Sequence, residues 1–192
     1  MDFDAVVVGL GNPGKEYKGT RHNIGADFVE QLANEEGLDF KKDKYLNAKL
    51  CAGEFAGKFV LFVLPEVFMN ESGKVLAVLA RKIPALNDKL VLVHDELHLL
   101  FAELKISCKK SAGGHNGVES VVSAIGSKTF CRIRLGIGKE KGKAPQNMKK
   151  FVLEKFNSAE REQTAEFYDK FKSALYLLLK EGEDKASNKF NV

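Results

Sequence analysis

The 192-residue chain is long enough to bury one hydrophobic core and too short to favour two ordinary domains. Its 44% hydrophobic and 29% charged residues, without a low-complexity tract, are typical of a folded protein and argue against a disordered chain. The net charge of +4 does not by itself indicate the kind of partner. The longest apolar run, 59–64, is too short to span a bilayer, and the acidic first residues do not form a signal peptide, so we expect a cytoplasmic protein.

The positive charge is concentrated in one part of the chain. Residues 105–155 hold 12 Lys or Arg against three acidic residues, whereas the remainder holds 18 basic and 23 acidic residues. Such a segment is either an ordinary solvated face or a surface that binds the phosphates of a nucleic acid.

The three cysteines, Cys51, Cys108 and Cys131, are an odd number, lie far apart and contain no C-x-x-C pair. This spacing favours reduced thiols that pack as small hydrophobic side chains. We therefore expect neither a disulfide framework nor a zinc site from them.

Strand and helix patterns alternate along the chain. We expect strands over 4–10, 89–95, 103–107 and 131–138 and a hairpin over 50–64. We expect helices from Ile24 to near Gly37, after Asn70, after Gly114 and over 158–181. Asn116 is the expected N-cap of the helix after Gly114, and Asn157 and Glu160 are expected to form a capping box at the start of the last helix. This alternation predicts a single α/β domain over residues 1–192.

Two short motifs resemble ligand sites but lack the required context. Gly9-x-Gly11-x-x-Gly14 has dinucleotide-binding spacing, yet Pro13 interrupts it and its last glycine does not open a helix. The segment HDELH, 94–98, resembles a zinc-binding His-Glu-x-x-His, but Asp replaces Glu and the segment ends a predicted strand, where residues four apart do not share a helical face. We expect neither a dinucleotide nor a metal.

Six polar residues follow or end predicted elements: Asn12, His22, Asn70, Asp95, His115 and Asn116. Each alone is more readily explained as a cap or a turn residue. Together they suit catalysis, because a histidine held by a carboxylate can activate water and carboxamides can stabilise a developing oxyanion. Since no Gly-x-Ser-x-Gly elbow or catalytic cysteine signature is present, the set predicts hydrolysis of an ester or amide by activated water.

Five motifs in this order resemble those of bacterial peptidyl-tRNA hydrolases: VVGLGNPGKEYKGTRHNIG, VLPEVFMNESG, HDEL, GGHNG and FCRIRLGIG, which together cover about 6–138. The resemblance implies an α/β domain with a twisted mixed β-sheet flanked by α-helices. It implies hydrolysis of the ester that joins a peptide to the 3′ ribose of tRNA, which recycles tRNA from prematurely released chains. Peptidyl-tRNA is then the partner, and we expect a monomer with no cofactor, no metal and no membrane contact.

The same resemblance implies a role for each matched residue. His22 would activate water, and Asp95 would orient His22. The carboxamides of Asn12, Asn70 and Asn116 would position the peptide and polarise the ester carbonyl, with Asn116 also placing the water. The residues expected to line the same cleft are Tyr17, Met69 and His115.

A basic pair that clamps a tRNA phosphate is also implied by the resemblance. Arg134 matches one member of the pair, whereas Ser107 stands where a Lys or Arg is usual. The nearby basic residues that could substitute are Lys105, Lys109 and Lys110.

Two alternative functions, both non-catalytic, are compatible with the same residues. Relatives of this family serve in organelles as intron-splicing partners without working as hydrolases, and a tRNA-binding module without catalysis is a further alternative. The chain shows no organelle transit peptide, which argues against the first. Replacing His22 by alanine distinguishes a tRNA-binding module from an enzyme, because only an enzyme has an activity that depends on His22.

Overall fold

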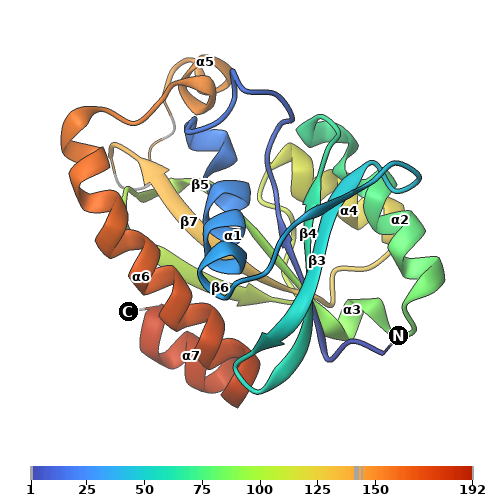
Figure 1. Ribbon diagram of the computed structural model, residues 1–192. Coiled ribbons are helices and arrows are strands. Elements are labelled where there is room, and N and C mark those ends of the chain that lie inside the picture. The colour runs from blue at the N-terminus through green and yellow to red at the C-terminus, as the bar shows by residue number, and fades with distance from the viewer. Residues whose placement is uncertain (1, 141–142, 144, 192) are drawn as a thin grey trace.

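The computed structural model describes residues 2–140, 143 and 145–191, which form a mixed β-sheet between two layers of helices (Figure 1). The seven-stranded sheet has the order β2-β3-β4-β1-β5-β7-β6. The strands are β1 (Ala5–Gly9), β2 (Lys41–Asp43), β3 (Ala48–Phe55), β4 (Lys58–Pro65), β5 (Leu90–Leu100), β6 (Leu104–Cys108) and β7 (Cys131–Gly138). The α/β fold expected from the sequence is confirmed.

The centre of the sheet is parallel and its edges are antiparallel. Neighbouring strands β4, β1, β5 and β7 run parallel, whereas β3, β2 and β6 add antiparallel pairs at the two edges. Because β4 and β5 lie on opposite sides of β1, the chain changes direction across the sheet at β1. Ligands of open α/β sheets bind beyond the carboxyl ends of the strands at such a point.

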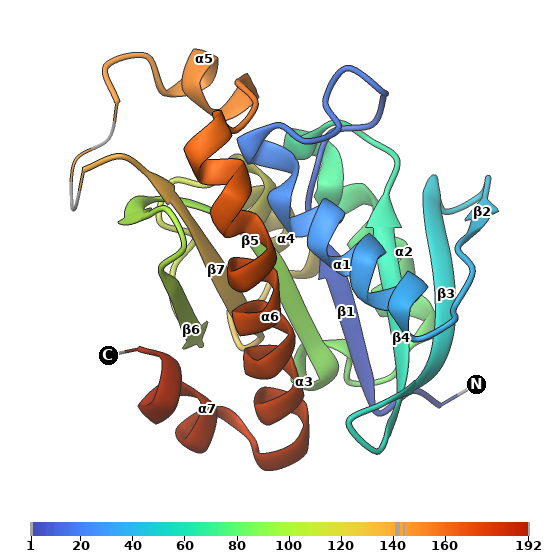
Figure 2. The same ribbon diagram turned by 60° about the vertical axis from the view of Figure 1, so that its left-hand side comes forward.

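Helices cover both faces of the sheet (Figure 2). One face carries α1 (Ile24–Glu35), α6 (Ser158–Glu181) and α7 (Glu183–Phe190), and the other carries α2 (Ser72–Lys82), α3 (Leu86–Lys89) and α4 (Asn116–Ile125). Short 3-10 helices η1 (Arg21–Asn23) and η2 (Met69–Glu71) follow β1 and β4. Val6, Val7 and Val8 of β1 are completely buried, as expected for a parallel strand covered on both faces.

The hairpin, the strand over 131–138 and the last long helix agree with the sequence prediction. The capping box of α6 is present, since Asn157 accepts from the Glu160 amide and Glu160 accepts from the Asn157 amide. The N-cap prediction for α4 is wrong: His115 is the cap, because its Nδ1 accepts from the amide of Val118, and Asn116 is the first helical residue.

The predicted end at Asp95 of the strand over 89–95 is also wrong. Strand β5 continues to Leu100, pairing with β7 through Glu96 and again at Leu100 after a shift of register. Asp95 therefore lies within a strand, paired with Leu135 of β7, although the pairing of β5 with β1 ends at Val93. This position explains its burial, with 2% of its surface exposed.

The expectation that all three cysteines are reduced is contradicted. Cys108 and Cys131 form a disulfide, because the antiparallel pairing of β6 with β7 places them directly opposite each other with Cα atoms 4.0 Å apart. Their separation of 23 residues in the sequence carries no sign of this pairing. Cys51 is free and buried, as expected.

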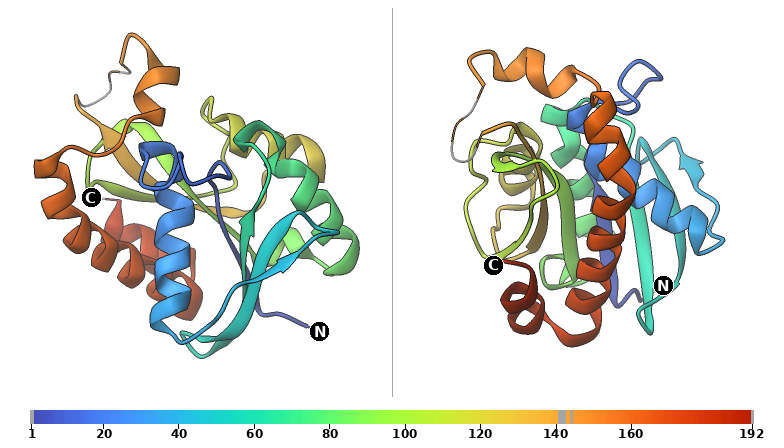
Figure 3. Two further views of the ribbon diagram at one scale, coloured as in Figure 1. Left: turned by 45° about the horizontal axis from the view of Figure 1, so that its top comes forward. Right: turned by 90° about the vertical axis from the view of Figure 1, so that its left-hand side faces the viewer.

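Two further features bear on the surface. The short helix α5 (Met148–Leu153) lies at the same end of the sheet as the loop over 10–20 (Figure 3). At the edge strand β6, the side chain of Asn191 accepts from the amide and donates to the carbonyl of Ile106, at 2.7 and 2.9 Å, and so satisfies edge-strand groups that no neighbouring strand pairs with.

Among residues 2–140, 143 and 145–191, none of the helices combines the length and apolarity that crossing a membrane requires.

Candidate active site

His22 and Asp95 are brought into contact by the start of α1. His22 lies on η1, and its Nδ1 is 2.9 Å from Oδ1 of Asp95 on β5. The approach needs a glycine three residues later, because a Cβ on Gly25 would lie 2.3 Å from the carbonyl oxygen of Val93. The helix thereby begins directly against β5, and residues 73 positions apart form a pair.

His115 is a second imidazole on the same carboxylate. Its Nε2 is 2.8 Å from Oδ1 of Asp95, while its Nδ1 accepts from the amide of Val118 at 3.3 Å. An amide can only donate, so the proton of neutral His115 is on Nε2 and points at Asp95. An ionised Asp95 likewise only accepts, which places the proton of neutral His22 on Nδ1 and leaves its Nε2 lone pair free.

The electrostatics of the cluster favour a charged carboxylate beside a basic imidazole. Burial would raise the pKa of Asp95, but His22 and His115 together outweigh it and hold that pKa well below its ordinary value. Burial lowers the pKa of His22, yet the charge and hydrogen bond of Asp95 outweigh this and raise it above 6.5. Proton loss from His22 therefore requires a higher pH than it does for an ordinary histidine.

His94 adjoins the cluster but is of a different kind. It is completely buried, its Nδ1 lies 2.7 Å from the carbonyl oxygen of Asp95, and its ring centre is 4.6 Å from that of His115. Burial, followed by the neighbouring His115, holds the pKa of His94 well below its ordinary value. A neutral His94 therefore supports the backbone of Asp95.

Asn12 is held by a network that also fixes η1 and η2. Its backbone amide donates to Asn23 Oδ1 and its carbonyl accepts from Asn23 Nδ2, both at 2.9 Å. Its side-chain oxygen accepts from the amide of Met69 at 2.8 Å. The side-chain nitrogen of Asn12 makes no hydrogen bond within the part of the chain that the structure describes, so it is available to donate to a substrate carbonyl.

The other predicted residues surround this network. Met69 is buried and packs under α4, where a Cβ on Gly117 would come within 2.5 Å of its sulfur. This contact joins η2 to the start of α4, so that Asn70 and Asn116 are exposed on adjoining elements. The ring of Tyr17 meets that of Phe68 edge to face, with centroids 6.3 Å apart. The sequence prediction did not include Phe68.

Arg134 lies opposite His94 in the β5–β7 pair and has a partner that the sequence prediction missed. Its Nε and Nη2 donate to Oε2 of Glu96, at 3.0 and 2.8 Å, and Glu96 is only 7% exposed. Ser107 Oγ is 3.4 Å from Arg134 Nη1, and Lys105 is the residue directly opposite Arg134 in the β6–β7 pair. Of the basic segment, Lys141 lies outside the described residues.

The donor atoms of His22, Asp95 and His115 all lie within 4.8 Å of one another, a set that could hold a metal ion. The hydrogen bonds argue against this use. Both imidazoles direct a proton at Asp95, and the amide of Val118 fixes that tautomer for His115, so neither offers a lone pair toward the carboxylate. The three side chains fit a hydrogen-bonded triad, with both imidazoles on one carboxylate, better than a metal site.

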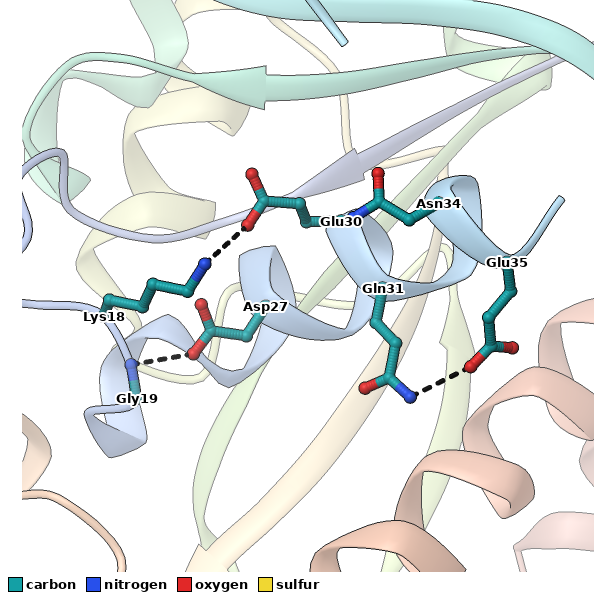
Figure 4. Close-up of a pocket in the computed structure, with 7 residues that line it drawn as sticks. All are labelled: Lys18, Gly19, Asp27, Glu30, Gln31, Asn34 and Glu35. Atoms are coloured by element: carbon teal, nitrogen blue, oxygen red, sulfur yellow. Dashed lines mark hydrogen bonds and ion pairs between the residues drawn. The ribbon is translucent and has the colours of Figure 1, made fainter. Parts of the chain in front are cut away.

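A hollow of about 530 Å³ lies beside α1 and contains none of the predicted site residues (Figure 4). It is lined by Lys18, Gly19, Asp27, Glu30, Gln31, Asn34 and Glu35. Burial raises the pKa of Asp27 to about 6, even though the Gly19 amide donates to it. The cluster of His22, Asp95 and His115 is not part of this hollow.

An imidazole–carboxylate pair with exposed carboxamides beside it, beyond the carboxyl ends of β1 and β4, has the composition of a hydrolytic site that uses general-base catalysis. The peptidyl-tRNA hydrolase family matches residues 6–192, and the chain belongs to this family.

Similar proteins agree with this assignment. The peptidyl-tRNA hydrolase of Mycolicibacterium vanbaalenii is 40% identical over 188 residues, which is 98% of this chain and 97% of that protein. That of Mycobacterium tuberculosis H37Rv is 38% identical over 187 residues, 97% of each chain. The crystal structure of peptidyl-tRNA hydrolase from Acinetobacter baumannii matches with a TM-score of 0.88 at 32% identity, covering 98% of this chain and 94% of that one.

Proposed function

We propose that the chain hydrolyses the ester between the peptide and the 3′ ribose of tRNA in peptidyl-tRNA, using water activated by His22. The observation that best supports this function is the 2.9 Å contact between His22 Nδ1 and Asp95 in a member of this family, because the contact leaves His22 Nε2 free to accept a proton. The reaction recycles tRNA from chains released prematurely.

The proposed reaction has two steps. Nε2 of His22 removes a proton from water as the water oxygen attacks the ester carbonyl, and Asp95 stabilises the imidazolium that forms. The tetrahedral intermediate then expels the 3′ oxygen of the ribose, which takes the proton back from His22. The products are a peptide carboxylic acid and tRNA with a free 3′ hydroxyl, and the base is restored.

Carboxamides serve the uncharged parts of the substrate in this proposal. The free side-chain nitrogen of Asn12 and the exposed amides of Asn70 and Asn116 donate to the peptide and to the developing oxyanion, with Asn116 also holding the water. Tyr17 and Met69 line the same cleft. His115 completes it and shares Asp95 with the base.

The tRNA is held by the basic surface. Arg134, with 25% of its side chain exposed, and Lys105 opposite it on β6 are the proposed phosphate contacts, with the exposed Lys109 and Lys110 beyond. Glu96 orients the Arg134 guanidinium and neutralises part of its charge. We propose further that residues 1–192 act as one unit, as a cytoplasmic monomer with no cofactor.

Release of tRNA from an N-acylated aminoacyl-tRNA tests the function, with unacylated aminoacyl-tRNA as the control. The proposal expects rapid turnover confined to the N-acylated substrate. Binding of either RNA without turnover would contradict it, and would favour the alternative of an RNA-binding or splicing-partner protein.

A further inference from the structure

The proposed base sits on an element too short to orient it. Helix η1 has three residues, and a single turn has little stability of its own. The position of His22 therefore depends on what its two neighbours contact. Asn23 is tied to Asn12 by two hydrogen bonds, and Arg21 holds the opposite side.

Arg21 is among the most buried side chains of the protein, with 2% exposure. Its Nη2 donates to both carboxylate oxygens of Glu160, at 2.9 and 2.6 Å, and its Nη1 donates to the carbonyl of Lys155 at 2.8 Å. Its backbone amide donates to the carbonyl of Glu154 at 3.0 Å. One residue thus joins η1 to the segment between α5 and α6.

Two aromatic rings enclose the same guanidinium. Its central carbon lies 4.5 Å from the ring centre of Phe151 on α5 and 5.2 Å from that of Phe156. Both rings are buried. The planar fork of arginine can contact a carboxylate, a carbonyl and aromatic faces at once, whereas lysine offers only a point charge.

Glu160, the partner of Arg21, is itself fixed. Its Oε2 accepts from the amide of Asn157 at 2.8 Å, and Asn157 accepts from the amide of Glu160 at 2.9 Å, as part of the α6 capping box. A rigid path therefore runs from the first turn of α6 through Glu160 and Arg21 to η1. A buried ion pair is weak evidence for stability by itself, so a geometric role is the better explanation of this one.

We propose that Arg21 is a positioning residue that docks η1 onto the first turn of α6 and so holds His22 against Asp95. The inference rests on the proposed function, in which His22 is the base. Removing the Arg21 fork lets η1 shift, and a shift of a reacting group by about 1 Å costs on the order of 100-fold in rate.

Arg21→Lys tests this directly. We expect kcat for N-acylated aminoacyl-tRNA to fall about 10- to 100-fold while KM changes little, because Arg21 is buried and has almost no surface with which to contact a substrate. His22 faces the titratable groups Asp95 and His115. Loosening its contact with Asp95 lowers the pKa of His22 toward its ordinary value, so the acidic limb of the pH–rate profile moves to lower pH.

Two further variants keep the test decisive. Glu160→Gln removes the charge but retains a residue suited to the capping box, and we expect a smaller loss of kcat with the same shift of the pH profile. Glu162→Gln is the matched control, since Glu162 is exposed on the same helix and its side chain makes no hydrogen bond or ion pair within the described residues. It should leave kcat and the pH profile unchanged.

Wild-type kcat and an unshifted pH profile in both Arg21→Lys and Glu160→Gln would overturn the inference. So would a loss of activity that only follows the loss of folded protein, with an unshifted profile, because that result assigns Arg21 a purely structural role. Retained activity in His22→Ala would instead contradict the proposed function on which the inference rests.

Discussion

Replacing Asp95 by asparagine keeps the shape of the side chain but removes the charge that faces His22 and His115. Attraction between unit charges about 4 Å apart at an effective dielectric constant of about 20 is about 4 kcal/mol. If most of it stabilises the imidazolium that forms in the reaction, its loss corresponds to about 10³-fold in rate. We therefore expect Asp95→Asn to lower kcat by about 10²- to 10⁴-fold.

The same substitution should also move the pH–rate profile in a defined direction. Asp95 raises the pKa of His22, and the neutral imidazole is the active form, so wild-type activity rises with pH through a midpoint above 6.5. Without the carboxylate, the pKa of His22 falls and the rise moves to lower pH. Single-turnover hydrolysis across pH 5 to 9 measures the loss of rate and the shift of the pH–rate profile. Fluorescence anisotropy measures tRNA binding by the same variant. A rate within about threefold of wild type, or lost tRNA affinity with normal chemistry, would refute the reasoning.

The remaining predictions concern the tRNA surface, metals and thiols. Arg134→Ala should weaken tRNA binding more than it slows hydrolysis of a minimal ester, and equal effects on tRNA and on the minimal ester would contradict the proposed contact of Arg134 with a phosphate. The same substitution should lower the free energy of unfolding by about 1–3 kcal/mol, because buried Glu96 loses its ion-pair partner. Treatment with EDTA should leave activity unchanged, whereas inhibition reversed by zinc would make His22, Asp95 and His115 metal ligands. Alkylation of the unfolded, unreduced protein should modify Cys51 alone, and reduction should lower stability by about 2–4 kcal/mol; three modified cysteines would contradict the disulfide.

Features determined by neighbouring residues were predictable from the sequence. Alternation predicted the strand over 131–138, and the spacing of Asn157 and Glu160 predicted a capping box that the structure confirms. Helix α5 was missed because six residues give too short a pattern to show periodicity. The strand end at Asp95 was misplaced because polar residues suggest exposure, whereas pairing with β7 continues past them.

Contacts between distant segments were not predictable in this way. Cys108 and Cys131 meet only through the pairing of β6 with β7, and the ion pairs of Glu96 with Arg134 and of Arg21 with Glu160 form only after folding. His22 and Asp95 were placed together by family resemblance alone, and the 2.9 Å contact now supplies the geometry. The tautomer of His115 depends on an amide of α4 and has no sequence signal.

The most direct test of the account compares wild-type protein with His22→Ala in release of tRNA from an N-acylated aminoacyl-tRNA. His98→Ala is the matched control, because His98 is exposed on β5, the strand that carries Asp95, and has no role in the proposed chemistry. Loss of the general base should lower the rate about 10²- to 10⁴-fold, with tRNA binding retained and the His98 variant unaffected. Unchanged turnover in His22→Ala would contradict the central claim that this imidazole activates the water.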